Sequence, residues 1–487
     1  MDATKNKNII LIDLMCDTIE QVMEVEHIFV SVWVTHRTDY EYIKNILSKY
    51  GNRIGIGFSY TGANPYTNTK YNLTYDEIED YIKCHHKCSR NSNRENCSTF
   101  ASDYSYYQAL QFWLWAFEIY KIDFVFLIGV DHGHYNDTIP IEIARNKGIQ
   151  TYIIDLLLAS PSKVAMALKH VNDDSYICLS EASNQKDVQM IDYLYSQTNA
   201  QEARKSTNCR THFLDTINSI IKTSKNIHDA RMLYDVFMHT AHSINPYIEK
   251  QREMKSIFRL KDFYQNIAID TYDPHDKFVF YALHFEPEAS ILNRTTLSNQ
   301  LFIIQILSEN LPDGWKLFVK EHPHQFRSSF YESYAVLRRS FKHNRSEWFY
   351  SGICSFKNTY LINYDIKSEK LITDASAVAT INGTVILESI AKNKPILIFG
   401  GDSTIFSKVN DVFDIRSASD VKEALAKINS NYTPNYENTT EILSDYAFEL
   451  GINTNSGLGI NADGSWSNDS KMLLKNLLIT LCDEKKN

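Results

Sequence analysis

Apolar runs and segments of helical periodicity alternate along the chain in two blocks, one before residue 160 and one after residue 276. The first block has apolar runs of strand length at residues 8–15, 27–35, 53–60, 123–130 and 151–157. Helical periodicity is found between them at residues 39–50, 106–120 and 139–146. Strands that alternate with helices are typical of a parallel sheet, so this block predicts an α/β domain.

The second block repeats the same rhythm. Its apolar runs predict strands at residues 277–284, 316–321, 360–364, 376–382 and 395–399. Its helices are predicted at residues 296–309, 329–341, 384–393 and 418–428. Each of the longer runs is apolar throughout and then turns abruptly polar, as buried parallel strands do when they deliver charged groups to the carboxyl edge of a sheet. A second α/β domain follows from this pattern.

The segments outside these two blocks set the expected domain boundaries. Residues 61–105 are polar with little periodicity and predict a long insertion, whereas residues 161–265 are largely helical by pattern. We therefore expect a first domain at 1–265 and a second at 266–435. Residues 436–487 are expected to form a tail with a final amphipathic helix that packs back on the first domain. The predicted fold class is α/β, with two Rossmann-like domains that face a cleft and carry helical insertions.

Composition and charge narrow the class of protein. The chain has 487 residues, 44% of them hydrophobic, which suits two folded domains and argues against disorder. A formal net charge of −9 gives no bulk basic footprint for nucleic acid, so no nucleic-acid partner is expected. The start of the chain lacks the pattern of a signal peptide, and no apolar run reaches the length of a membrane span. We expect a cytoplasmic protein, with peripheral association at the inner face of the membrane left open.

The cysteines offer one metal candidate. Cys84 and Cys88 form the segment CHHKC, and Cys97 follows shortly after. This cluster lacks the paired second half that a zinc site needs, so an exposed polar insertion is the competing interpretation. We expect no metal site and no essential cofactor.

Two strand ends of the second block carry groups that suit a phosphate. Lys320 and His322 follow the run LFV, and Pro323 stops that strand and fixes the turn. Asn382 and Gly383 end another strand, and a helix begins at Thr384 with Glu388 one turn further on. A helix N-terminus offers free N–H groups to an anion, and Thr384 and Glu388 share one helix face. Ordinary surface turns and an N-cap threonine are the competing interpretations.

Acids and imidazoles also follow two other strands. His284, Glu286 and Glu288 come directly after the run FVFYAL, with Arg294 nearby as a candidate to neutralise a donor phosphate. Paired carboxylates of this kind serve as base, nucleophile or sugar-hydroxyl ligands, or simply solvate a loop. In the first block, Asp131, His132, His134 and Asp137 follow the strand at 123–130. They predict a catalytic base facing the donor, against a structural His–Asp pair.

Together the segments LHFEPEAS, VKEHPHQ and TINGTVILESIAKNKPILIFG resemble the glycosyltransferases of capsular polysaccharide and lipopolysaccharide biosynthesis, which include transferases of CMP-linked Kdo. The DHGHYND segment, followed by EIARNKGIQTYIIDL, is similar to the pattern of their N-terminal domain. The resemblance covers residues 123–157 and 277–402. It departs from the family at Val385–Leu387, where members often have Gly-Trp before the glutamate, and this leaves the donor open.

The resemblance implies a GT-B-type fold and metal-independent transfer of a sugar from a nucleotide-activated donor, with a CMP-sugar favoured, to a glycan or glycolipid acceptor. It implies that Lys320 and His322 contact the donor phosphate, that Gly383, Thr384 and Glu388 hold the nucleotide, and that Glu286 and Glu288 face the sugar. No apolar strand ends in the Asp-x-Asp of metal-dependent transferases. A CDP-alditol polyol-phosphate transferase of the teichoic-acid type and a non-catalytic nucleotide-sugar-binding subunit are the alternatives.

Overall fold

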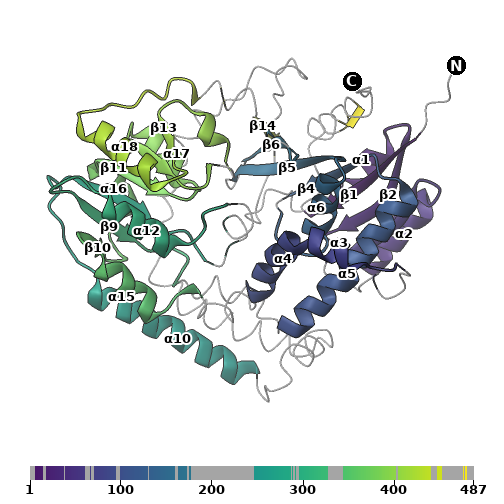
Figure 1. The fold of residues 1–487 in the computed structure, drawn as a ribbon, viewed down its shortest axis with the longest axis horizontal. Helices are drawn as coiled ribbons and strands as arrows, with labels where there is room; N and C mark the ends of the chain where they lie inside the picture. Colours follow the sequence, from purple (N-terminus) through teal and green to yellow (C-terminus); the bar gives the residue numbers. More distant parts are fainter. Residues whose placement is uncertain are drawn as a thin grey trace.

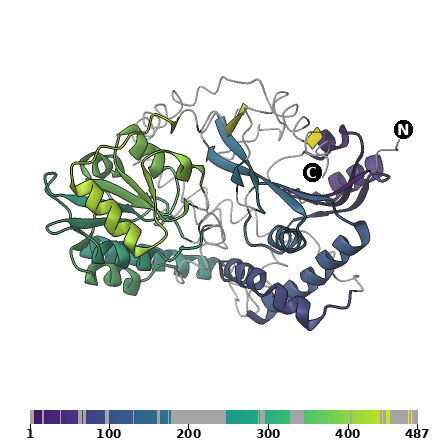
Figure 2. The ribbon, with the colours of Figure 1, turned by 45° about the horizontal axis from the view of Figure 1, so that its top comes forward.

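The fold consists of two lobes, each built around its own sheet, as the computed structural model of the chain shows (Figure 1). It describes residues 6–14, 18–37, 39–60, 66, 71–94, 99–129, 131–159, 163–172, 175–176, 246–286, 288, 291, 295–326, 344–401, 404–439, 442, 447–451, 475 and 478–479. The first lobe is drawn in purple and blue and the second in teal and green (Figures 1 and 2).

The first sheet has Rossmann order in its parallel part. Its strands are β1 (Lys7–Asp13), β2 (Ile28–Thr35), β3 (Ile54–Ser59), β4 (Phe124–Ile128), β5 (Gln150–Ala159), β6 (Lys163–His170), β7 (Ser175–Tyr176) and β14 (Ala447–Gly451). Strands β3, β2, β1, β4 and β5 are parallel neighbours in that order. Strand β6 pairs antiparallel with β5, and both β7 and β14 pair antiparallel with β6. The sequence order of the parallel strands thus reverses between β1 and β4.

Helices cover both faces of the first sheet. They are α1 (Ile19–Met23), α2 (Tyr40–Tyr50), α3 (Tyr75–Asp80), α4 (Ile82–Arg94), α5 (Thr99–Tyr120) and α6 (Thr138–Asn146). One face packs against α1 and α2, with Ile19, Val22 and Ile43 in its core. The other packs against α4, α5 and α6 around Trp113, which is fully buried. Because β1 and β4 are covered on both sides, all of β4 and the central residues 9–12 of β1 are apolar.

Two expectations for the first lobe were wrong. The 61–105 stretch was expected to be a long polar insertion with little periodicity, yet its described part contains α3, α4 and the start of α5. Cys84, Cys88 and Asn91 are buried on one side of α4, so small thiols supply the apolar stripe that the polar composition hides. Residues 163–176 belong to the stretch 161–265 that was expected to be largely helical, but they form β6 and β7, because pairing with β5 overrides local helix preference.

The second sheet is wholly parallel. Its strands are β8 (Phe278–Ala282), β9 (Lys316–Lys320), β10 (Thr359–Leu361), β11 (Ala377–Thr380), β12 (Ile396–Ile398) and β13 (Val412–Asp414). They lie in the order β10-β9-β8-β11-β12-β13, which is the order 3-2-1-4-5-6 of a Rossmann fold. The reversal therefore falls between β8 and β11. The predicted fold class, with two Rossmann-like domains, is confirmed; the cleft expected between them stays a prediction.

The helices of the second lobe complete its two cores. They are α10 (Pro246–Ile267), α12 (Gln300–Glu309), α15 (Glu347–Ser355), α16 (Ser368–Asp374), α17 (Val385–Ala391), the 3-10 turn η4 (Ile405–Lys408) and α18 (Ala418–Asn429). Buried side chains of α10, α12, α15 and α18 fill the core on one face, and α16 packs on the other with Phe278, Phe280 and Phe318. Helix α10 thus belongs to the second core, although the first domain was expected to extend to residue 265.

Several elements of the second lobe and of the C-terminal segment also differ from the prediction. Helices α15 and α16 and strand β13 were not predicted, while the predicted helix 329–341 and most of 471–481 lie outside the described residues. The C-terminal segment returns to the first lobe, where β14 pairs with β6 and Leu478 joins the core against β1 and β2. The described residues contain no helix that is long and apolar enough to cross a membrane.

Packing at the centre of the second sheet predicts a large loss of stability when Phe280 is shortened. Its ring is fully buried in β8, so Phe280→Ala leaves a cavity and lowers the free energy of unfolding by about 3–5 kcal/mol. Phe302→Ala is the matched control, because that ring is 51% exposed on α12 and costs less than ~1 kcal/mol. Urea denaturation followed by circular dichroism measures both variants. Equal losses would contradict the assigned core.

Candidate functional site

The second lobe brings its predicted site residues together at the carboxyl edge of the sheet, where the strand order reverses. Strands β8 and β11 are parallel neighbours, so the segments that follow them leave the sheet side by side. The His284 ring lies over Gly383, where an added Cβ would come within 3.1 Å of His284 Nε2. Gly383 also has a φ of +113°, a conformation that side chains disfavour. Open α/β sheets bind ligands in the crevice at this reversal.

Strand β9 adds its own end to the same edge. Ala282 is in register with Lys320, and the Leu283 N–H donates to the Lys320 carbonyl at 3.0 Å. The side chain of Lys320 is largely buried, with Nζ 5.4 Å from the centre of the Tyr364 ring. His322 follows two residues later and lies 6.0 Å from the Phe285 ring, centre to centre. The residues that are predicted to bind phosphate, from two strands, therefore lie at one edge of the sheet.

The two imidazoles at this edge differ in protonation. Burial, together with the neighbouring His284 and His324, lowers the pKa of His322 to about 3, so His322 is neutral at pH 7. Its Nδ1 accepts from the His324 backbone N–H at 3.1 Å, which leaves the proton on Nε2.

Burial opposes the charged form of His284 as well, but Glu288 outweighs it and raises the pKa of His284 above its usual value. Glu288 Oε2 lies 3.1 Å from His284 Nδ1. The His284 main chain is fixed by Gln300, whose Oε1 accepts from the His284 N–H at 2.6 Å. The edge therefore presents one imidazole that favours a positive charge beside one that stays neutral, and such pairs take different roles in a reaction.

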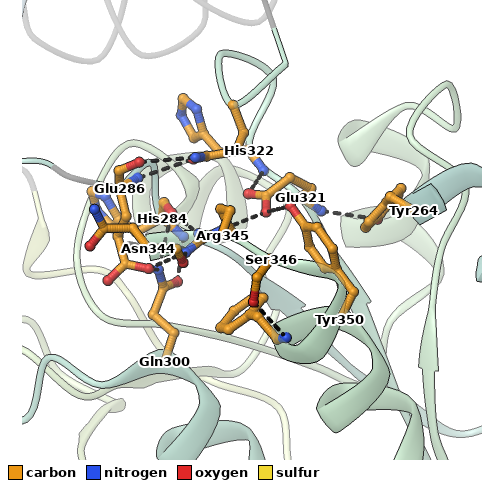
Figure 3. A network of polar contacts seen from close by, with 12 residues as sticks. Tyr264, His284, Glu286, Gln300, Glu321, His322, Asn344, Arg345, Ser346 and Tyr350 are labelled. Carbon is orange, nitrogen blue, oxygen red and sulfur yellow. Dashed lines mark hydrogen bonds and ion pairs between the residues drawn. The ribbon is translucent and has the colours of Figure 1, made fainter. Parts of the chain in front are cut away.

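A buried ionic cluster lies directly behind the imidazoles (Figure 3). The Arg345 guanidinium, which is fully buried, donates from Nε to Glu321 Oε2 at 2.7 Å and from Nη1 to Glu286 Oε2. Gln300 Nε2 also donates to Glu286, and the Tyr350 hydroxyl donates to Glu321, each at 2.7 Å. Glu286, predicted as a catalytic carboxylate, is thus engaged in an ion pair with Arg345.

The remaining predicted residues of this lobe lie around the same edge. Thr384 is the exposed N-cap of α17 and makes no capping hydrogen bond with its side chain. Asn382 is largely buried, Glu388 is half-buried one turn into α17, and Pro323 is exposed in the turn after β9. Arg294 lies outside the described residues.

The first lobe places its predicted residues at the corresponding edge, after β4. Asp137 caps α6 and is fully buried, where it accepts from the N–H groups of His132 at 3.1 Å, His134 at 2.9 Å and Thr138 at 2.6 Å. The Tyr60 hydroxyl donates to it as well, at 2.8 Å. Burial acts to raise the pKa of Asp137, but these donors and the charge of His132 lower it overall. Asp137 therefore holds the loop together, as in the structural His–Asp pair that was the alternative, and its catalytic role stays a prediction.

The pKa of Asp131 shifts in the opposite direction. Burial and the charge of Asp137 raise the pKa of the Asp131 carboxyl, although Thr138 Oγ1 and the Gly133 N–H donate to its Oδ1 at 2.5 and 2.9 Å. Its side chain is half-buried. His134 is stacked against the Tyr60 ring at 4.5 Å between centres, and its Nδ1 accepts from the Asn136 N–H. Of the two carboxyls, Asp131 is thus the one whose charged form is disfavoured.

Sequence reasoning missed Arg345, Gln300 and Tyr350, which carry the cluster behind the imidazoles. No motif marks these residues, and Arg345 meets Glu286 and Glu321 across 59 and 24 positions of sequence. Among the described residues, no three His, Cys, Asp or Glu side chains are arranged to hold a metal ion. Cys84 and Cys88 are buried and form no disulfide, and Cys97 lies outside the described part of the chain.

Comparison with known proteins yields a likeness of fold. No family model and no curated protein sequence matches the chain. The KpsC β-Kdo 2,7 transferase of Thermosulfurimonas dismutans is 10% identical over 92% of this chain and 99% of its own, with a TM-score of 0.31. The UDP-GlcNAc 2-epimerase of Neisseria meningitidis is 12% identical over 97% and 100%, with a TM-score of 0.21. The calicheamicin glycosyltransferase CalG4 is 9% identical over 90% and 92%, with a TM-score of 0.25.

The environments of the two histidines predict separate titrations. His284 should titrate above pH 6.5 and His322 near pH 3, as monitored by NMR of the imidazole carbons, with His284→Gln and His322→Gln for assignment. A raised pKa means that the stability from His284 is present below pH 6.5 and is lost as the pH rises through the folded-state pKa. For His322 the unfolded chain takes up its proton first, so folding stability declines as the pH falls from about 6.5 to 3. Coincident titrations would contradict the assigned environments.

The capping role of Asp137 predicts a structural penalty. Asp137→Ala removes the acceptor of several buried N–H groups and should lower the free energy of unfolding by about 2–4 kcal/mol. Asp39→Ala is the matched control, since Asp39 is an exposed N-cap of α2 that accepts from the Glu41 N–H and should cost about 1 kcal/mol or less. Thermal and urea denaturation compare them. A loss for Asp137→Ala no larger than the control's would show that Asp137 has another role.

Proposed function

We propose that this protein is a metal-independent glycosyltransferase that moves a sugar from a nucleotide-activated donor, with a CMP-linked acidic sugar favoured, to a glycan or glycolipid acceptor. One observation carries the proposal. Two imidazoles, one whose pKa is raised by a carboxylate and one that is neutral, lie with Lys320 at the strand-order reversal of a Rossmann-type sheet, and Gly383 leaves room for close approach. These groups suit a donor phosphate at the position where such sheets bind ligands.

In this proposal, the donor phosphate lies across the ends of β8, β9 and β11. The neutral His322 donates from Nε2, because its Nδ1 is occupied by the His324 N–H. His284, held by Glu288, and the ammonium of Lys320 supply positive charge. Thr384 contributes a hydroxyl whose oxygen is not used as a helix cap. Asn382 and Glu388 then face the nucleoside, and Arg294 is the further predicted cation.

Transfer breaks the bond between the anomeric carbon and the phosphate oxygen and forms a bond from that carbon to an acceptor hydroxyl oxygen. The developing charge on the leaving phosphate is stabilised by the donors already in place, which is the task that a metal ion performs in other transferases. A base accepts the proton of the acceptor hydroxyl. We assign this role to Asp131, with His134 beside it, because Asp137 is buried in its capping interactions.

Isothermal titration calorimetry with CMP, CDP, UDP and GDP, each with and without EDTA, tests the proposal. We expect CMP to bind with unchanged affinity in EDTA, and His322→Ala to weaken it about 10- to 100-fold through loss of a charge-assisted hydrogen bond. His275→Ala is the matched control, an exposed histidine of the same lobe that should leave affinity unchanged.

The other outcomes separate the alternatives. Selective binding of UDP or GDP keeps the transferase and discards the CMP-sugar donor. Preference for CDP, with turnover of a CDP-alditol, favours a polyol-phosphate transferase. A non-catalytic subunit is favoured by two results together. The parent protein turns over no donor sugar, and Asp131→Asn still binds nucleotide. If no nucleotide binds, the phosphate site at Lys320, His322 and Thr384 is wrong.

A further inference from the structure

We infer that Arg345 is a positioning residue, which connects the segments after β8 and β9 and thereby sets where His284 and His322 lie before any ligand arrives. The inference rests on the proposed function only in taking these two imidazoles as ligand-binding groups. Arg345 itself is fully buried, so it touches no ligand. Its place behind the imidazoles is visible in Figure 3.

The contacts of Arg345 reach both strand ends. From the β8 end, the His284 carbonyl accepts from Nη2 at 2.8 Å and Glu286 Oε2 accepts from Nη1. From the β9 end, Glu321 Oε2 accepts from Nε at 2.7 Å. The Asn344 carbonyl, on its own segment, accepts at 3.0 Å. The guanidinium thus bonds directly to the main chain of one imidazole residue and to the neighbour of the other.

Both carboxylates also accept hydrogen bonds from other residues, which makes the cluster rigid. Glu321 accepts from the Tyr350 hydroxyl at 2.7 Å, and its Oε1 accepts from the His322 backbone N–H at 2.6 Å. Glu286 accepts from Gln300 Nε2 at 2.7 Å. A shift of Glu321 therefore carries the His322 main chain with it. Any shift of Arg345 acts on both imidazoles through one or two hydrogen bonds.

Only an arginine fits this set of acceptors. The guanidinium presents five N–H donors in a plane, and here Nη1 and Nη2 donate to the segment after β8 while Nε donates to the segment after β9. A lysine ammonium keeps the charge that two buried carboxylates require, but it places three donors on one atom and loses the His284 carbonyl or one carboxylate. A separate tie between the two segments remains in Arg345→Lys, because Gln325 exchanges hydrogen bonds with the Glu286 main chain at 3.1 and 2.9 Å.

Arg345→Lys therefore separates positioning from folding. We expect a folded protein whose CMP affinity is at least about tenfold lower, with the NMR titration midpoints of His284 and His322 shifted from those of the parent. Arg53→Lys is the matched control, since the Arg53 guanidinium binds the main-chain carbonyls of Met23, Val25 and Ile28 in the first lobe. It should change thermal stability alone. Tyr350→Phe, which removes one donor to Glu321, should give a smaller loss of affinity of about two- to fivefold and serves if Arg345→Lys does not fold.

Two results would overturn the inference. One is parental CMP affinity and unchanged histidine titrations in folded Arg345→Lys. The other, if that variant does not fold, is the same parental behaviour in Tyr350→Phe. Failure of the proposed function gives a different result. The parent protein then binds no nucleotide, but the titrations of its histidines can still be measured by NMR. Shifted titrations in Arg345→Lys then support positioning without the transferase.

Discussion

The order of the parallel strands is the constraint from which the rest of the second lobe follows. Right-handed crossovers place β9 and β10 on one side of β8, and β11, β12 and β13 on the other. The chain segments that follow β8 and β11 therefore leave the sheet side by side, where the strand order reverses. His284 and Gly383, which are almost a hundred residues apart in sequence, meet there for this reason.

The buried cluster around Arg345 compensates polar groups at that edge for the loss of water. Three strand ends deliver polar groups to a small volume, and each group must be paired as it loses water. One guanidinium serves two carboxylates, and the amide of Gln300 and the hydroxyl of Tyr350 complete their hydrogen bonds. An ion pair of this kind contributes little to stability compared with an apolar replacement. Its effect on the structure is the fixed geometry that it imposes on the segments that carry the adjacent imidazoles.

Sequence patterns predicted the parts of the fold that local chemistry determines. Fully apolar strands such as β4 and β8 are unmistakable, because both faces of a parallel sheet are covered. Helix α4 was missed because Cys84, Cys88 and Asn91 form its buried side, a stripe without the aliphatic residues that signal a helix. Strand β6, with the sequence KVAMALKH, carries helix-forming residues and becomes a strand through its pairing with β5. Pairing with a neighbouring strand leaves no mark in the residue types of β6 itself.

The candidate site divides in the same way. That polar groups follow buried strands can be read from sequence, and His284, Lys320 and His322 do lie at one edge. Sequence alone cannot show which of the two acids is available for chemistry, because Asp131 and Asp137 have the same side chain and lie six residues apart. Asp137 meets the N–H groups at the start of α6, which favour its charged form, whereas Asp131 lies beside that charge. Protonation follows from these neighbours, and the neighbours exist only in the folded chain. The same argument separates His284, which a carboxylate holds, from His322, which faces other imidazoles. Residue type therefore indicates where the chemistry lies, and the folded environment assigns each residue its role.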